Sequence, residues 1–288
     1  LDPRSIYGKF SFSRLCADAG VLDDFIEPAE SILTKAFSKL VAVDSRRWIK
    51  FLTDILPRFS CELAASLSDF EKRMLQMFYI TVFQEAADWR SHTTQANMQL
   101  LADSPIMMHE LNELLSFNLE RIDFIDQPVP LGFDCPLDLH CTYTRDQILI
   151  AMDYMTPKNV REGVKWLPDK QVDVFFITLN KADKDYSPTT MYNDYSINES
   201  LFHWQSQSTT SDTASTGQRY INHRQRGSKV VLFVREFKQD SIGAAPYTCL
   251  GTAAYVKHTG SKPMNITWHL DQPIPAKYLR KTNKLVVG

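Results

Sequence analysis

The spacing of the apolar residues changes at a proline-rich joint, DQPVPLGFDCPLD at residues 126–138. Before the joint, apolar residues recur every three or four positions, which is the spacing of one face of a helix. After it, they form short runs and alternating patterns that are typical of β-strands. This order predicts an α+β protein with a helical region at residues 1–127 and a β-rich domain at residues 128–288.

The first region has the features of an N-terminal helical bundle. Residues 30–41 carry an apolar stripe at helical spacing, and SDFE at residues 68–71 has the spacing of a capping box. Asp44 is placed to cap the helix that carries Trp48. Nothing in this region has the pattern of a catalytic site.

The second region contains β-type runs at residues 172–179, 229–237, 247–256 and 264–270. The first two runs are nearly continuous in apolar residues, as in strands that are covered on both faces. The last run, MNITWHL, alternates, so Ile266 and Trp268 share one side while Thr267 and His269 share the other. Strands at this spacing predict a mostly antiparallel, curved sheet or a small barrel.

Charge is distributed unevenly along the chain. The net charge is only −2, but residues 1–130 hold 13 Lys and Arg against 19 Asp and Glu, whereas residues 131–288 hold 19 against 15. Six cations fall within residues 219–238: Arg219, Arg224, Arg226, Lys229, Arg235 and Lys238. Such a cluster is what binding to a phosphate backbone requires, and it is equally compatible with a solvated surface.

The composition also bears on location. No apolar run approaches the roughly 20 residues of a membrane helix, and the N-terminus lacks the features of a signal peptide. Five scattered cysteines fit reduced thiols better than disulfides. We therefore expect a cytoplasmic protein without a membrane partner, and the start at Leu1 indicates a segment of something longer.

The common sequence signatures of nucleotide hydrolysis, zinc proteolysis and serine hydrolysis are missing. Cys135, His140 and Cys141 are possible metal ligands, but no second ligand pair follows them, and we assign no metal, cofactor or catalytic residue. An alternative is a metal-dependent nuclease of the PD-(D/E)xK kind. Its residues would be Asp169 or Asp173, with Glu236 and Lys238 at a strand end.

Aromatic and amide side chains alternate from residue 186 to residue 220. Flat rings can stack on bases, amides can hydrogen-bond to base edges, and Arg can neutralise phosphate. The ligand-binding candidates are Tyr192, Asn193, Asp194, Phe202, His203, Trp204, Gln205, Gln207 and Tyr220, and the phosphate-binding candidates are Arg219, Arg224, Arg226 and Lys229. The same stretch could instead be a loop whose aromatic rings tuck into the sheet.

The segments TLNK, YSPTTMY, FHWQSQS, GQRYI and LFVRE occur in this order between residues 178 and 236. In sequence and spacing they resemble an uncharacterised domain family at the C-terminal end of bacterial superfamily 2 DEAD/DEAH-type helicases. Many of these helicases begin with a phospholipase-D-like nuclease domain. The resemblance implies a module of a DNA-processing or phage-defence protein, whose partners are DNA and the helicase core and nuclease domains of the same longer chain.

The resemblance assigns no role to single residues, and the motor and nuclease motifs are not in this sequence. Any ATP-dependent helicase activity would belong to the longer chain, and this segment would be non-catalytic. By analogy, a curved β unit with an aromatic loop is similar to the pocket folds that read modified or flipped bases. The leading hypothesis is a DNA-binding and substrate-reading module, and the alternatives are the nuclease and a protein-interaction module of the helicase.

Overall fold

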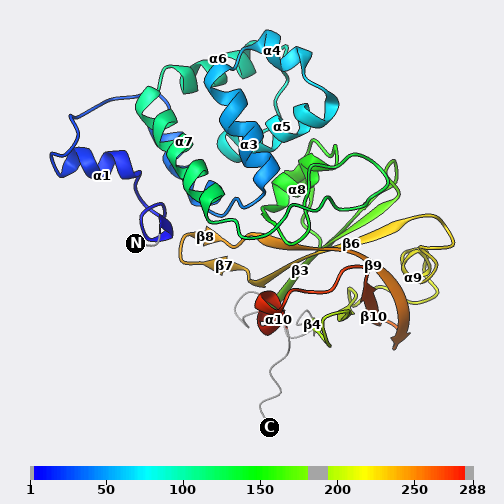
Figure 1. Ribbon diagram of the computed structural model, residues 1–288. Coiled ribbons are helices and arrows are strands. Elements are labelled where there is room, and N and C mark those ends of the chain that lie inside the picture. Colours follow the sequence, from blue (N-terminus) through cyan, green and yellow to red (C-terminus); the bar gives the residue numbers. More distant parts are fainter. Residues whose placement is uncertain (1–2, 181–193, 283–288) are drawn as a thin grey trace. The chain divides into compact units, whose positions relative to one another are not determined.

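The protein is described by a computed structural model that covers residues 3–180 and 194–282 (Figure 1). The chain divides into two compact units. The first unit comprises Leu1–Pro128, Asp134–Val160 and Gln239–Pro246, and the second comprises Val129–Phe133, Arg161–Lys238 and Tyr247–Gly288. Helices dominate the first unit and strands the second, which confirms the predicted α+β class. No helix among the described residues is both long and apolar enough to cross a membrane.

The first unit is mainly helical. Its α-helices are α1 (Phe12–Asp18), α2 (Glu30–Leu40), α3 (Arg46–Ile55), α4 (Cys61–Ser66), α5 (Asp69–Phe83), α6 (His92–Ala102), α7 (Pro105–Glu120) and α8 (Arg145–Ala151). Short elements complete it: η1 (Pro3–Ser5), η2 (Leu56–Arg58), η3 (Pro157–Asn159), β1 (Thr142–Tyr143), β7 (Gln239–Asp240) and β8 (Gly243–Ala244). Strands β7 and β8 pair antiparallel.

Helix α5 is buried without interruption from Met74 to Val82. The predicted capping box is present, because Ser68 and Glu71 exchange side-chain and backbone hydrogen bonds. The indole of Trp48 donates to the Met74 carbonyl of α5 over 2.9 Å. The cap of α3 is Ser45 rather than Asp44, because the Asp44 carboxylate accepts the backbone N–H of Thr142 instead.

The second unit is built on one open sheet. Its strands are β2 (Val164–Leu167), β3 (Val172–Asn180), β4 (Tyr195–Ser196), β5 (Leu201–Gln205), β6 (Lys229–Phe237), β9 (Tyr247–Thr259) and β10 (Asn265–Leu270), and its helices are α9 (Ser215–Ile221) and α10 (Ala276–Thr282). Within the sheet the strands follow the order β2-β3-β6-β9-β10-β5-β4. Only β3 and β6 run parallel along this path. Among the described residues the sheet is therefore mostly antiparallel, as predicted, and it does not close into the barrel considered as the alternative.

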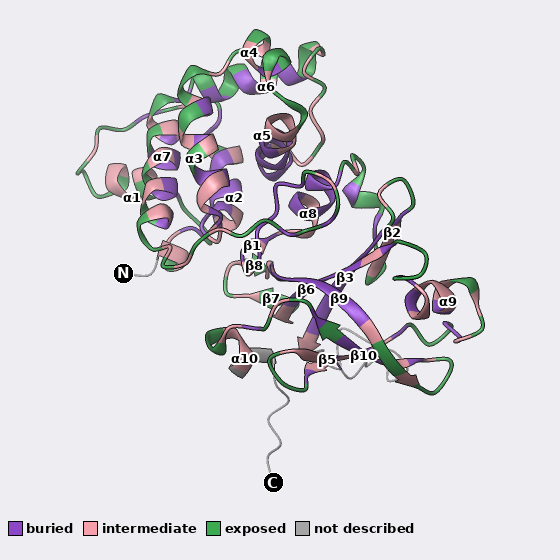
Figure 2. Cartoon of the chain, turned by 45° about the vertical axis from the view of Figure 1, so that its right-hand side comes forward, coloured by how far each residue is buried: buried purple, intermediate pink, exposed green. Residues whose placement is uncertain are grey.

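Burial differs along the sheet (Figure 2). Strands β3 and β6 are buried over most of their length on both faces, as their continuous apolar runs predict. Strands β5 and β10 alternate between buried and partly exposed residues. The buried side chains of one face form a core around Phe175, whose ring centroid lies 4.4 Å from that of Trp204 and 5.5 Å from that of Trp268.

His223 ties the turn after α9 to strand β9. Its Nδ1 lies 3.1 Å from the Ser228 carbonyl oxygen, and its Nε2 accepts the Tyr255 backbone N–H over 3.1 Å. An imidazole that accepts at Nε2 and donates from Nδ1 is neutral. The residue is only 3% exposed, and its ring packs against Trp268. A protonated His223 imidazole would therefore not be solvated by water.

This arrangement predicts acid sensitivity. Burial lowers the pKa of His223 below its ordinary value of 6.5, so the unfolded chain takes up the proton at a higher pH than the folded chain. The stabilisation is complete above about pH 6.5 and declines as the pH falls. Between about pH 7.5 and 5.5, we expect wild type to lose more free energy of unfolding than His223→Gln, by up to about 1.4 kcal/mol per pH unit. Urea denaturation measures this difference.

The control is His92→Gln, which changes an exposed histidine of α6. It should retain the pH dependence of wild type. The same pH dependence in His223→Gln as in wild type would show that the buried imidazole does not carry the effect.

Candidate nucleic-acid interface

Strand β5 carries four of the predicted ligand-binding residues, and the strand separates them. In the antiparallel register with β10, Phe202 faces Trp268 and Trp204 faces Ile266, whereas His203 faces Thr267 and Gln205 faces Asn265. Successive side chains of a strand point to opposite faces of the sheet. The rings of Phe202 and Trp204 therefore cannot share a pocket with His203 and Gln205.

Three of the predicted ligand-binding rings lie in the core. Phe202, Trp204 and Tyr220 are all buried. Trp204 and Tyr220 contact each other edge to face at 5.6 Å, and both pack against Phe175. Burial raises the pKa of the Tyr220 phenol well above its usual range. This corrects the expectation of a base pocket lined by these rings, because their faces are occupied by neighbouring core side chains.

The other ligand-binding candidates fall in different places. Asp194 is buried, and its carboxylate accepts the backbone N–H of Gln205 over 2.9 Å, so it anchors β5. Gln207 is exposed in the loop after β5. Tyr192 and Asn193 lie outside the described residues.

Arg219, a predicted phosphate ligand, is instead part of a buried ion pair. Its Nε and Nη2 donate to the two carboxylate oxygens of Asp173 over 2.8 and 2.9 Å. The Arg219 side chain is 17% exposed, that of Asp173 is fully buried, and the guanidinium lies over the Trp166 ring at 4.5 Å. Burial raises the pKa of Asp173, and the bonds from Arg219 act in the opposite direction. Arg219 thus joins α9 to β3.

The remaining predicted phosphate ligands differ in exposure. The Arg224 side chain is 70% exposed and lies 3.7 Å from the Asp271 carboxylate. Arg226 is exposed in the same turn. Lys229 is half-buried, and its ammonium donates to the Pro130 carbonyl oxygen over 2.8 Å. Arg224 and Arg226 are therefore the two members of the predicted set that can reach a phosphate from solvent.

The residues of the nuclease alternative do not meet. In the parallel pair β3–β6, Asp173 lies opposite Val230, and Glu236 follows six positions later along β6. At about 3.3 Å per residue, the two carboxylates are separated by about 20 Å along the strands. Asp169 precedes Asp173 and lies at the same end. Within the described part of the chain, no cluster of His, Cys, Asp and Glu is arranged to hold a metal ion.

The register brings together a different set of side chains on the outward face of β4, β5, β10 and β9. One row crosses all four strands: Tyr195 opposite His203, His203 opposite Thr267, and Thr267 opposite Lys257. The next row holds Gln205, Asn265 and Thr259, and His269 follows Thr267 on β10. We call this surface the polar sheet face: Tyr195, His203, Gln205, Lys257, Thr259, Asn265, Thr267 and His269. All eight are half-buried or exposed.

Two contacts organise the polar sheet face. The Tyr195 and His203 rings stack with centroids 4.8 Å apart and an interplanar angle of 16°. The Gln205 Nε2 donates to Asn265 Oδ1 over 3.0 Å. The face thus combines a ring stack, an amide pair, hydroxyl groups and the exposed ammonium of Lys257. Sequence alternation already places Asn265, Thr267 and His269 on one side of their strand, but it does not reveal that β5 is the neighbour.

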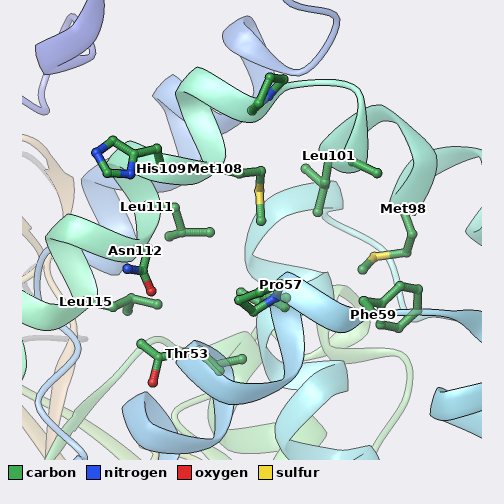
Figure 3. A pocket seen from close by; sticks show the side chains of 14 residues that line it. Thr53, Pro57, Phe59, Met98, Leu101, Met108, His109, Leu111, Asn112 and Leu115 are labelled. Carbon is green, nitrogen blue, oxygen red and sulfur yellow. The ribbon is translucent and has the colours of Figure 1, made fainter.

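A cavity of about 400 Å³ lies in the first unit, between α3–η2 and α6–α7 (Figure 3). Leu52, Phe59, Met98, Leu101 and Leu115 are among the apolar residues that line it, and Thr53, His109 and Asn112 are its polar members. None of the predicted site residues within the described ranges lines this cavity, so it is not the base pocket expected from those residues.

Comparison with known protein families identifies a match in the second half of the chain. The model of the family described as Domain of unknown function (DUF3427) matches residues 137–281. Among curated proteins, no sequence matches this chain.

The Arg219–Asp173 pair predicts that removing a buried arginine lowers the free energy of unfolding more than removing an exposed one. Arg219→Met leaves the Asp173 carboxylate buried without its partner, so we expect the free energy of unfolding to fall by about 3–5 kcal/mol. Arg224→Met makes the same change on an exposed side chain and should cost less than about 0.5 kcal/mol. Chemical denaturation measures both variants, and equal losses would contradict the structural role of Arg219.

Proposed function

This chain belongs to the family described as Domain of unknown function (DUF3427), and we propose that its second unit binds nucleic acid, chiefly DNA, through the polar sheet face. The observation that carries the proposal is the row Tyr195, His203, Thr267 and Lys257 across four neighbouring strands. Rings supply stacking surfaces for bases, and an ammonium supplies a phosphate contact.

The amide pair next to this row supports base contacts. Gln205 and Asn265 offer hydrogen-bond donors and acceptors on the same face as His203. We therefore assign the base contacts to the outward side chains of β5 and β10, and not to the buried rings of Phe202, Trp204 and Tyr220.

Exposed cations near the ends of these elements support backbone contacts. Lys262 lies in the hairpin between β9 and β10, and Arg224 and Arg226 lie in the turn after α9. Arg224 reaches toward Asp271, the residue directly after β10. The phosphate contacts of the proposal are therefore Lys257 on the polar sheet face and Lys262 in the adjoining hairpin, because the turn that carries Arg224 and Arg226 lies on the core side of the sheet.

The resemblance to helicase-associated domains supports a role for this nucleic-acid binding within a longer DNA-processing protein. We place the chain as the substrate-reading part of a bacterial helicase that acts in DNA processing or phage defence. In this proposal the helicase core and a nuclease domain of the same longer chain are its partners. Strand opening and cleavage belong to those parts, and the polar sheet face holds the DNA.

Binding of a short fluorescein-labelled DNA to the full 288-residue chain, followed by anisotropy at several salt concentrations, tests the proposal. We expect affinity to fall as salt rises, because phosphate contacts release counterions. Lys257→Ala should weaken binding and reduce the slope of log affinity against log salt by about 0.7–0.9, the value for one lost phosphate contact.

Lys50→Ala is the matched control, since it removes an exposed lysine from α3 of the first unit. It should leave both affinity and slope unchanged. If DNA does not bind, or if the two lysine variants behave alike, the polar sheet face is not a nucleic-acid interface, and the protein-interaction alternative takes its place.

A further inference from the structure

We propose that the polar sheet face binds single-stranded rather than duplex nucleic acid. This inference rests on the proposed function and specifies its substrate class. Three properties of the face carry it: the ring stack, the amide pair and the width of the surface.

The ring stack selects bases whose faces are accessible. Tyr195 and His203 are stacked on each other across β4 and β5, and both residues are half-buried rather than enclosed in the core. In a duplex, the faces of interior bases are covered by the neighbouring base pairs. Only an unpaired, unstacked base can stack on a protein ring, which is how aromatic side chains on sheet surfaces hold single strands.

The amide pair also favours unpaired bases. Gln205 and Asn265 are joined by one hydrogen bond, and the pair retains an acceptor oxygen on Gln205 and a donor nitrogen on Asn265. Neighbouring donors and acceptors are what the Watson–Crick edge of a base requires. That edge is occupied in a duplex and open in a single strand.

The width of the face disfavours a groove of duplex DNA. The row from Tyr195 to Lys257 crosses four strands, and three inter-strand spacings of about 4.8 Å give about 14 Å between the outer backbones. The major groove is about 12 Å wide and admits a helix or a two-stranded ribbon. A four-stranded surface is too broad to enter it, but it can support two or three nucleotides side by side.

The test compares three fluorescein-labelled probes on the full chain: oligo(dT), a duplex of the same length and an abasic strand of the same length. We expect oligo(dT) to bind at least about tenfold more tightly than the other two, because only it offers unpaired bases for stacking. His203→Ala should remove about tenfold of the oligo(dT) affinity and leave the abasic strand unchanged.

His92→Ala, on an exposed position of α6, is the matched control and should not change binding of any probe. Circular dichroism of each variant checks that the fold is retained, and Tyr195→Phe, which keeps the ring, should bind as wild type. Equal or tighter binding of the duplex overturns the single-strand inference while the proposed function stands. Binding of none of the three probes overturns both.

Discussion

The pairing of β5 with β10 determines both the core and the candidate site of the second unit. In this register Phe202 and Trp204 lie beside Trp268 and Ile266 in the core, while His203 and Gln205 lie beside Thr267 and Asn265 on the outside. A shift of one residue would exchange the two sets, placing amides in the core and indoles in solvent. The apolar residues that stabilise the fold therefore also hold the polar row in position.

The segment between β5 and β6 is anchored on the core side of the sheet by contacts that the sequence alone did not disclose. Arg219 bonds to Asp173 of β3, and His223 accepts from the backbone of β9. Gly217 is required where α9 passes Ser211, because a Cβ there would lie 2.0 Å from the Ser211 carbonyl oxygen. With these anchors, the GQRYI segment of the sequence has a structural explanation that does not require a ligand.

Local sequence patterns predict the fold class, whereas the candidate site depends on which strands pair with one another. The capping box at Ser68, the buried runs of β3 and β6 and the alternation of β10 follow from residue spacing, and the structure confirms them. The buried partner of Arg219 and the neighbour of β10 depend on contacts between distant segments, which composition cannot supply. An arginine in a basic stretch therefore indicated phosphate binding, although its carboxylate partner lies 46 positions earlier in the chain.

Photo-crosslinking of the full chain to a 5-iodouracil-substituted single strand, with the crosslinked peptides identified by mass spectrometry, tests the central claim most directly. The account predicts crosslinks on the peptides that contain Tyr195 or His203, lost when unlabelled strand is added in excess. Crosslinks confined to the helices of the first unit, or none that the unlabelled strand displaces, would contradict it.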